Sequence, residues 1–252
     1  AFDEALDSCF RHRLYPDYKA NREPAPEELR RQFAHCKALC AALGLAVLAN
    51  HEYEADDLIG SALHRARPAG YRGLIVSADK DLSQLLGEHD EQWDYARATR
   101  WGADGVKARH GVHAHQIADY LALSGDAVDN IPGVTGIGAK TAAVLLAHFG
   151  SLDALLERID EVAFLRLRGA ARVAASLREQ REQALLFRQL TTIACDAPLG
   201  YSEAAAVRAP ADPEMLEALA GTLRFGPMTR RRLRQAAGLE GEPGAQPPPH
   251  PA

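Results

Sequence analysis

Hydrophobic and polar residues follow two regimes along the chain. In the first 112 residues, short apolar runs at 45–49, 73–77 and 92–96 have the length of buried strands. Helical patterns at about 27–43 and 55–67 lie between these runs. Strands that alternate with helices indicate a parallel or mostly parallel sheet, so this region is predicted to be α/β.

Beyond residue 112 the pattern becomes almost entirely helical. Helices are predicted at 115–123, 139–148, 151–159 and 170–193, followed by a pair near 213–223 and 227–237. The last stretch is rich in Pro and Gly, which favours a disordered tail or linker. We therefore divide the chain into regions 1–112, 113–240 and 241–252.

Acidic residues recur where apolar runs end and turns or helices begin. They are Asp3, Glu54, Asp56, Asp57, Asp79, Asp81, Asp126 and Asp129. Each motif alone could be a helix cap or a turn. Because the carboxyl ends of parallel strands share one edge of a sheet, we expect the eight carboxylates to converge there. Mutual repulsion would require cations between them, and oxygen ligands select Mg²⁺ or Mn²⁺, which predicts a metal-dependent phosphoryl-transfer site.

The composition is compatible with a metal-dependent phosphoryl-transfer site and argues against a membrane span. The chain has 252 residues, 47% of them hydrophobic and 25% charged, as in ordinary soluble globular proteins, and no run approaches 18 apolar residues. Without the eight clustered carboxylates, the net charge changes from −5 to +3, so a nucleic-acid partner is compatible with it. Cys36 and Cys40 lie one turn apart beside His35, but no second ligand pair follows, which favours reduced thiols over a zinc site.

A glycine-rich segment gives the second strong signal. It reads Gly133-Val134-Thr135-Gly136-Ile137-Gly138-Ala139-Lys140-Thr141. Glycines allow a phosphate to approach the backbone, while a helix N-terminus and Lys140 attract it. A Walker loop does not fit, because a helix and an Asp-rich loop precede the segment. We interpret it as a helix–hairpin–helix that holds a DNA backbone, the alternative being a plain glycine turn.

A basic segment, Tyr18-Lys19-Ala20-Asn21-Arg22, is a weaker signal because such loops are usually only solvated. Beside an acidic metal site it could grip a negatively charged substrate.

Together these motifs resemble one family. The matching segments are Phe2-Asp3, Phe10-Arg11-His12, Tyr18 to Arg22, Tyr53 to Asp57, Ala78 to Asp81, Gly125 to Val134 and Gly136 to Thr141. Over about residues 1–240 they closely resemble the 5′ nuclease domain of bacterial family-A DNA polymerases and its stand-alone relatives, the 5′ exonucleases and flap endonucleases.

The resemblance implies a PIN-like (resolvase-like) α/β domain with a mostly parallel sheet and a helical arch, followed by an all-helical helix–hairpin–helix region. It implies a structure-specific 5′–3′ exonuclease or flap endonuclease that hydrolyses DNA phosphodiester bonds in replication and repair. Residues 11–22 would lie in or near the arch, with Lys19 and Arg22 on the scissile phosphate. The DNA-binding residues would be Arg11, Tyr18, Gly133, Gly136, Gly138, Lys140 and Thr141.

The resemblance also implies two Mg²⁺ or Mn²⁺ ions and a K⁺ ion held by hairpin carbonyls. Asp3, Glu54, Asp56 and Asp57 would serve the first divalent ion, and Asp79, Asp81, Asp126 and Asp129 the second. A further metal-binding Asp of the family, with its strand and helix, is expected upstream of residue 1. We expect a monomer that acts on DNA with 5′ ends or flaps in the cytoplasm, at the nucleoid, and not at a membrane.

Two alternatives remain from the sequence. One is a DNA-junction binding module without catalysis, although such a module has no reason to keep eight carboxylates. The other is a PIN-type ribonuclease, which the helix–hairpin–helix disfavours because that element follows duplex DNA.

Overall fold

The computed structural model describes residues 1–5, 8–200 and 207–239. Contacts divide the chain into two compact units: unit 1 contains residues 1–22 and 49–199, and unit 2 contains residues 23–48 and 200–252. The predicted boundary near residue 112 falls inside unit 1 and stays a prediction. The predicted tail, 241–252, lies outside the described residues.

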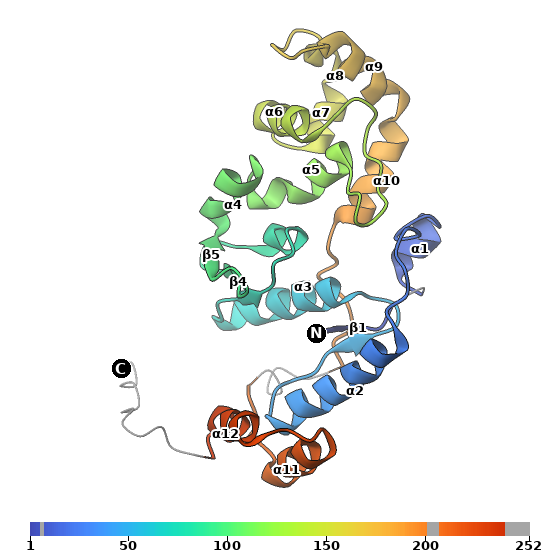
Figure 1. The fold of residues 1–252 in the computed structure, drawn as a ribbon. Coiled ribbons are helices and arrows are strands. Elements are labelled where there is room, and N and C mark those ends of the chain that lie inside the picture. Colours follow the sequence, from blue (N-terminus) through green and yellow to red (C-terminus); the bar gives the residue numbers. More distant parts are fainter. Residues whose placement is uncertain (6–7, 201–206, 240–252) are drawn as a thin grey trace, which may run out of the picture. The chain divides into compact units, whose positions relative to one another are not determined.

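Unit 1 begins with short strands and helices that mix in sequence and continues as a helical region (Figure 1). Its elements are β1 (Phe2–Asp3), α1 (Phe10–Leu14), β2 (Ala49–Asn50), α3 (Ala55–Ala66), η1 (Arg67–Ala69), β3 (Leu74–Val76), η2 (Asp81–Leu85), β4 (Glu91–Asp94), β5 (Thr99–Gly102), α4 (Ala103–His110), η3 (Ala114–Gln116), α5 (Ile117–Ser124), α6 (Ala139–Phe149), α7 (Leu152–Glu157), α8 (Ile159–Val162), α9 (Ala170–Glu179) and α10 (Arg181–Thr191). This agrees with an α/β region followed by a helical one.

The strands form two small sheets rather than one. In the first, β1 pairs in parallel with β2, with Asp3 opposite Asn50. In the second, β3 pairs in parallel with β4, and β4 pairs antiparallel with β5. The parallel pairs confirm the predicted topology. The hairpin partner β5 was not predicted, because it depends on the turn at Ala98, where φ is +50°, and not on a clean apolar alternation.

Helix α3 shows how the sequence begins an element at the right residue. Glu54 is extended at the N-cap, and the Asp57 side chain accepts a hydrogen bond from its N–H at 3.0 Å. Such a reach back from the third helical position satisfies a donor that the helix cannot. The helix ends at Ala66, two residues before Pro68, which lies in η1. Gly70 follows η1 in the left-handed region.

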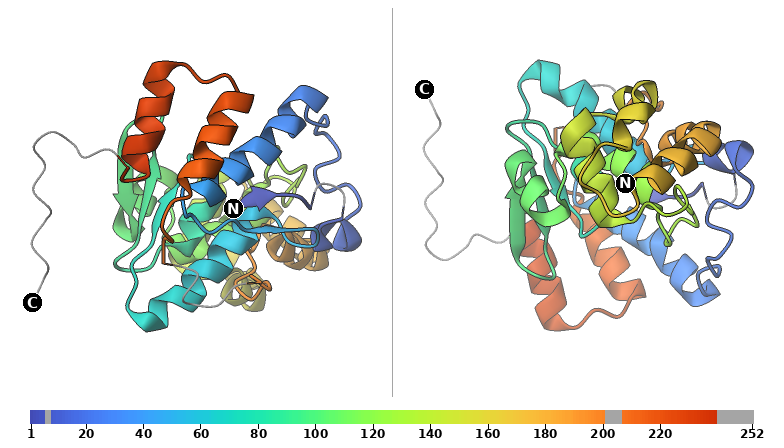
Figure 2. Two further views of the ribbon diagram at one scale, coloured as in Figure 1. Left: turned by 90° about the horizontal axis from the view of Figure 1, so that it is seen from below. Right: turned by 90° about the horizontal axis from the view of Figure 1, so that it is seen from above.

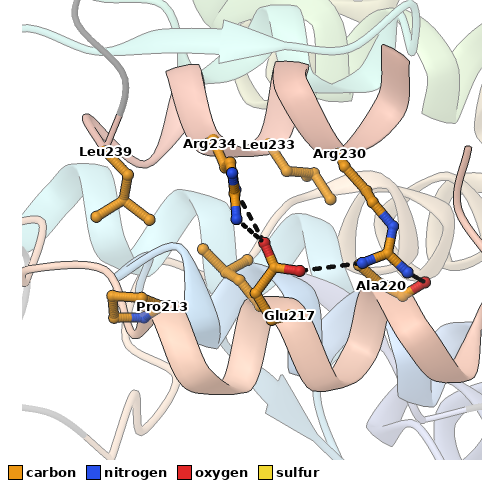
Figure 3. Close-up of a pocket in the computed structure, with 8 residues that line it drawn as sticks. Pro213, Glu217, Ala220, Arg230, Leu233, Arg234 and Leu239 are labelled. Carbon is orange, nitrogen blue, oxygen red and sulfur yellow. Dashed lines mark hydrogen bonds and ion pairs between the residues drawn. The ribbon is translucent and has the colours of Figure 1, made fainter. Parts of the chain in front are cut away.

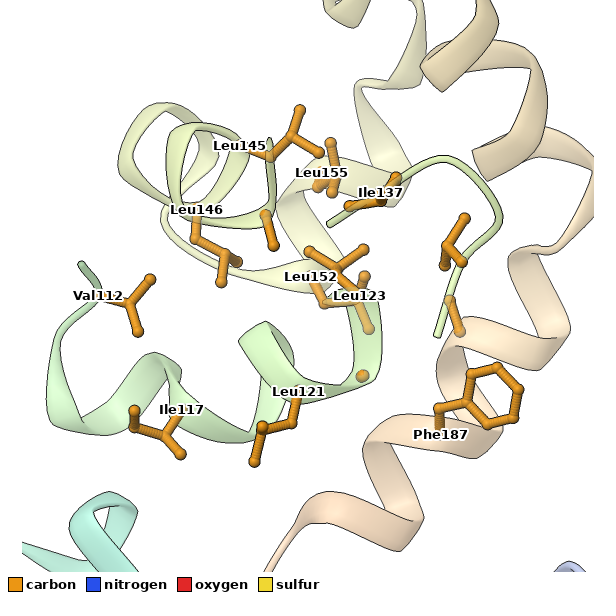
Figure 4. Close-up of a cluster of buried hydrophobic side chains, with 14 of the residues drawn as sticks. Val112, Ile117, Leu121, Leu123, Ile137, Leu145, Leu146, Leu152, Leu155 and Phe187 are labelled. Atoms are coloured by element: carbon orange, nitrogen blue, oxygen red, sulfur yellow. The ribbon is translucent and has the colours of Figure 1, made fainter. Parts of the chain in front are cut away.

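The core of unit 1 lies among its C-terminal helices. Apolar side chains of α5, α6, α7 and α10 belong to one buried cluster, which includes Leu121, Leu145 and Phe187 (Figure 4). Leu145 is fully buried, and burying such a side chain contributes about 1.5–3 kcal/mol. The helix predicted at 170–193 is two helices, because Gln180 leaves helical geometry between α9 and α10.

Unit 2 packs three helices, α2 (Glu27–Ala42), α11 (Pro213–Thr222) and α12 (Pro227–Ala236), as the sequence predicts (Figure 2). Between α11 and α12, Glu217 forms ion pairs with Arg230 at 3.0 Å and Arg234 at 2.8 Å (Figure 3). The ion pairs lie over a cavity of about 260 Å³ that Leu216 and Leu233 line. In the described ranges, no helix has both the length and the apolar character needed to span a bilayer.

Candidate functional site

Seven of the eight predicted carboxylates line one cleft of about 570 Å³ in unit 1. They are Asp3, Glu54, Asp56, Asp79, Asp81, Asp126 and Asp129. Lys19, Arg22, Ser77 and Lys80 line the same cleft. The structure thus brings together four motifs that are far apart in the sequence.

Local structure explains how the carboxylates reach the cleft. Asp3 ends β1, while Asp79 and Asp81 follow β3. The 79–81 turn is closed by its own side chains, because Ser77 Oγ accepts from the Asp79 N–H and Asp79 Oδ1 accepts from the Asp81 N–H. Such side-chain turns are a property of Ser and Asp, so the turn and the ligands come from the same residues.

The last acidic pair lies in a loop after α5. Asp126 and Ile131 exchange both backbone hydrogen bonds, at 2.7 and 2.8 Å. Asn130, at φ +57°, turns the chain, and Asn is one of the few residues that accept this conformation readily. The loop therefore presents Asp126 and Asp129 as a compact turn.

A set of hydrogen bonds, which we call the seam, joins residues 17–22 to residues 126–131. The backbone N–H of Lys19 donates to the carbonyl of Asp129 at 3.0 Å. Asn21 Nδ2 donates to the Ala127 carbonyl at 2.8 Å, and Asn130 Nδ2 donates to the Asp17 carbonyl at 2.7 Å. The seam holds the basic segment against the acidic loop.

The seam places two predicted catalytic cations among the carboxylates. Lys19 Nζ forms an ion pair with Glu54 and lies 3.9 Å from Asp129 Oδ1. Arg22 lies 2.6 Å from the same oxygen of Asp129. Both cations are thus inside the cleft, where a phosphate would enter.

Tyr18 has a different position from the one predicted. Its ring is buried, and its hydroxyl lies 2.9 Å from both Glu54 Oε2 and Asp129 Oδ2. Burial beside these two carboxylates raises the pKa of Tyr18 far above its ordinary value, so the hydroxyl stays protonated and donates. Tyr18 fixes two acidic side chains, and a direct contact with DNA does not fit this burial.

Arg11 and Asp57 are also corrections to the sequence reading. Arg11 is buried, and its guanidinium donates to Asp57 Oδ2 at 2.7 Å, to Asp57 Oδ1 at 2.8 Å and to Glu54 Oε2 at 3.0 Å. Asp57 is fully buried and also accepts from the backbone N–H groups of Glu54 and Ala194. Asp57 is outside the cleft lining, and both its oxygens are engaged, so it is a support for Glu54 rather than a metal ligand.

Lys80 is a residue that the sequence reading missed. Its ammonium lies 2.6 Å from Asp126 Oδ2 and 3.3 Å from Asp81 Oδ1, so it links two of the predicted second-ion ligands. The sequence contained a clue to this role, because Lys80 lies between two predicted ligands of one cation. Its ammonium must either pair with these carboxylates or point away from them.

Acidic side chains outnumber basic ones in the cleft lining. Burial, together with Asp79 and Glu54, raises the pKa of Asp56 to about 7. Burial and the neighbouring acids Asp79 and Asp126 raise the pKa of Asp81 to about 6, against the pull of Lys80. Burial alone would raise the pKa of Glu54, but Lys19 and Arg11 hold it below its ordinary value. Carboxylates that resist ionisation in this way favour added positive charge.

The donor set fits hard divalent cations. It consists of carboxylate oxygens, and the buried Asp81 Oδ1 has the ammonium of Lys80 3.3 Å away but no hydrogen bond of good geometry. The carboxylates border the cleft instead of meeting at one point, since no three His, Cys, Asp or Glu side chains in the described ranges are already arranged around a single metal position.

The hairpin residues form an open, glycine-rich turn before α6. Gly133 and Gly136 have φ of +70° and +82°, and Gly138 is the N-cap of α6. A side chain at Gly133 would meet the backbone of Gly125 at 2.3 Å, whereas Gly136 and Gly138 have open space around them. The first glycine thus allows close packing of the chain, and the other two leave the turn accessible.

Exposed groups surround that turn. Lys140 is exposed, Thr141 is half-buried, and both lie in the first turn of α6, whose first N–H groups have no acceptor within the helix. This arrangement can receive an anion, since N–H groups and the helix dipole both favour negative charge.

Gln180 attaches the hairpin to the break between α9 and α10. Its side-chain oxygen accepts from the Thr135 N–H at 3.1 Å and lies 3.2 Å from Thr135 Oγ1. A groove of about 470 Å³ lies beside this attachment, between the hairpin and α10. Gln180 could not be recognised from the sequence, because a glutamine inside a long helical pattern looks like an ordinary surface residue.

Family models match nearly the whole chain in two parts. Residues 1–111 match the model described as "5′-3′ exonuclease, N-terminal resolvase-like domain". Residues 112–214 match the model described as "5′-3′ exonuclease, C-terminal SAM fold".

Curated relatives include polymerases and a shorter protein. DNA polymerase I of Pseudomonas aeruginosa is 41% identical over 243 residues, which cover 95% of this chain and 26% of the relative. Flap endonuclease Xni of Pectobacterium carotovorum is 38% identical over 197 residues, which cover 78% of this chain and 73% of the relative. The chain thus spans about a quarter of the polymerase relatives it matches.

Solved structures share the fold. A bacteriophage T5 5′-exonuclease with bound zinc superposes with a TM-score of 0.62 at 21% identity and covers 91% of this chain and 79% of its own. The T5 flap endonuclease in a complex with DNA and metal ions has a TM-score of 0.61 at 21% identity, with coverages of 92% and 81%.

Proposed function

Because the chain belongs to the 5′–3′ exonuclease family, we propose that it is a structure-specific 5′ nuclease. It hydrolyses phosphodiester bonds of DNA at 5′ ends and at the base of 5′ flaps, with divalent cations as cofactors. The observation that carries the proposal is the cleft in which seven carboxylates and three basic side chains come together.

The cleft residues supply the ligands. Asp3, Glu54 and Asp56 would hold one Mg²⁺ or Mn²⁺ ion, and Asp79, Asp81, Asp126 and Asp129 the other. When bound, such ions supply positive charge that lowers the pKa of the attacking water and stabilises the leaving oxygen. Asp57 is left out of the ligand set, since it is fully buried and does not line the cleft.

Lys19 and Arg22 act on the substrate phosphate. Each is held by a carboxylate and lies in the cleft, so each can exchange that partner for a phosphate oxygen without leaving the site. Arg22 offers a planar fork that matches phosphate geometry, and Lys19 offers a point charge. Preorganised charge of this kind stabilises the transition state more than the ground state.

Lys80 neutralises part of the negative charge of Asp81 and Asp126 before a metal ion binds. In the described structure it lies between Asp81 and Asp126, so a cation that binds these residues must displace its ammonium. Lys80 would then be free to turn toward the phosphodiester backbone.

The hairpin binds the DNA backbone at a point distant from the scissile bond. Gly136, Gly138, Lys140 and Thr141 present an accessible turn and a helix N-terminus to a backbone phosphate, and the glycine carbonyls would hold a K⁺ ion. Backbone contacts of this type position a duplex without reading its sequence. We extend the proposal to a monomer that acts in the cytoplasm on replication and repair intermediates.

The test is cleavage of a 5′-labelled flap duplex with Mg²⁺ or with chelator. Wild-type protein should cut at the flap junction only with Mg²⁺, and Asp79→Asn should abolish cutting. Asp104→Asn is the matched control, because Asp104 is exposed on α4 and outside the cleft.

Other outcomes identify the alternatives. Flap binding without cutting by either protein would indicate a non-catalytic DNA-binding module. Faster cutting of an RNA flap substrate than of its DNA counterpart would indicate a ribonuclease.

A further inference from the structure

The segment between α8 and α9 is basic and exposed. Residues 163–172 contain three arginines and no acidic residue. Arg166, Arg168 and Arg172 are exposed, whereas Leu165 and Leu167 between them are partly buried against the core. The alternation turns the leucines inward and leaves the charges in solvent, so residues 163–172 form a defined surface, which we call the arginine segment.

These arginines have no internal partners. Among the described residues none of the three forms an ion pair or a side-chain hydrogen bond. The nearest acidic residues in the sequence are already used, since Asp160 pairs with Arg178 and Glu161 pairs with Arg158. Most other arginines of unit 1 do have partners, so the charge of the arginine segment is available to an external anion.

An aromatic side chain begins the arginine segment. Phe164 is 87% exposed, more than any other large hydrophobic residue that the structure describes. A phenylalanine in water gains nothing for folding, so its position beside three unpaired arginines suggests a surface that is covered when a partner binds.

The arginine segment and the hairpin lie at opposite ends of α9 (Figure 1). The segment leads into the N-terminus of α9 at Gly169, and Gln180, which holds Thr135 of the hairpin, follows its C-terminus. A helix of this length, Ala170–Glu179, spans about 15 Å. The length of this helix is comparable with the width of the major groove of B-DNA, about 12 Å.

We propose that the arginine segment is a second contact for the sugar–phosphate backbone of duplex DNA, about one groove away from the hairpin. Arg166 and Arg168 bind phosphates, and Phe164 packs against the sugars between them. The inference rests on the proposed function, because it assumes that the hairpin receives duplex DNA.

Salt dependence provides the test. The affinity for a fluorescent flap duplex is measured by anisotropy in chelator over a range of KCl concentrations, for wild type and for Arg166→Ala/Arg168→Ala. Because each phosphate contact contributes about 0.9 to the slope of log K against log salt, the slope should become shallower by about 2. The control is Arg72→Ala/Lys107→Ala, which removes two exposed cations that also lack partners among the described residues.

A third variant separates charge from packing. Phe164→Ala should weaken binding without changing the salt slope, because the ring releases no counterions. Under saturating substrate, the cutting rate of the Arg72→Ala/Lys107→Ala control should stay at the wild-type value, since neither residue lines the cleft or belongs to the arginine segment.

The failures are distinguishable. If wild type neither binds nor cuts flap DNA, the proposed function and the inference both fail. If wild type binds and cuts but the arginine variant keeps the wild-type slope, or loses no more than the control, only the inference is overturned. It is also overturned if the loss depends on the length of the single-stranded flap and not on the duplex arm.

Discussion

Arg11 offers the sharpest division between what the sequence suggested and what the structure shows. As a DNA contact, its loss should reduce binding and leave the fold intact. As a buried partner of Asp57, its loss should lower the free energy of unfolding. The variant Arg11→Met keeps most of the aliphatic volume and removes the guanidinium, so it isolates the polar contacts.

The magnitude follows from the hydrogen bonds that disappear. Arg11 donates to both oxygens of Asp57, to Glu54 Oε2, and to the carbonyls of Leu190 at 2.8 Å and Thr192 at 2.9 Å. Asp57 would remain as a fully buried carboxylate with two backbone donors. Removing one partner of a buried ion pair costs about 3–5 kcal/mol. A loss of about 4 kcal/mol lowers the folding equilibrium constant roughly a thousandfold.

Urea unfolding in chelator, followed by circular dichroism and by the fluorescence of Trp93 and Trp101, measures this loss. Arg13→Met is the matched control, because Arg13 pairs with Glu52 while its side chain is 63% exposed. Its ion pair should contribute less than about 1 kcal/mol.

Two results would refute the argument. One is an Arg11→Met protein whose free energy of unfolding is within about 1 kcal/mol of that of the Arg13→Met control. The other is a double variant, Arg11→Met/Asp57→Leu, that is no more stable than Arg11→Met. Replacing both charges should recover part of the loss, since no buried charge is then left unpaired.

Three further predictions concern other parts of unit 1. Burial would raise the pKa of Asp90, but hydrogen bonds from the Gly73 and Gly87 N–H groups and from Arg67 lower it below 3.8. The ionised Asp90 therefore stabilises the fold fully above about pH 4, and this contribution is lost as the pH falls through the pKa that Asp90 has in the folded protein. Asp90→Asn should flatten the dependence of the free energy of unfolding on pH below about pH 4, as measured by urea titrations. Gln180→Ala should weaken flap-duplex binding about 5-fold, as expected for one lost hydrogen bond of about 1 kcal/mol, while Gln183→Ala, in the same groove, should not, and equal affinities in anisotropy would contradict the hairpin attachment. Lys19→Ala should lower single-turnover cutting about 10²-fold or more, and near-wild-type turnover would remove Lys19 from catalysis.

The sequence predicted the elements and the cleft well because both depend on local rules. Apolar runs followed by Asp gave β3 and the 79–81 turn, and the glycine spacing gave the hairpin before α6. Asp3, Asp79 and Asp81 lie at the carboxyl ends of parallel strands, as this argument requires, whereas Asp126 and Asp129 lie in a loop after helix α5 that it does not place. These inferences need only periodicity and chain direction.

What the sequence did not reveal was the partner of each charge. Asp56 and Asp57 are neighbours at the start of α3, yet one faces the cleft and the other faces Arg11 in the core. Adjacent helical residues point about 100° apart, and only the packing of α1 against the C-terminal end of α10, where the carbonyls of Leu190 and Thr192 accept from Arg11, decides which of them meets an arginine. Tyr18 and Lys80 were misread or missed for the same reason.

The seam makes assembly of the cleft a late event in the life of the chain. Lys19 and Asp129 are 110 residues apart, and closing so long a loop must be complete before any of their contacts forms. Pairings at such sequence separation slow folding, and they are absent while the first hundred residues are emerging from the ribosome. A chain synthesised only as far as residue 125 would therefore carry most of the acidic residues but no finished cleft, because Asp126 and Asp129 complete its lining.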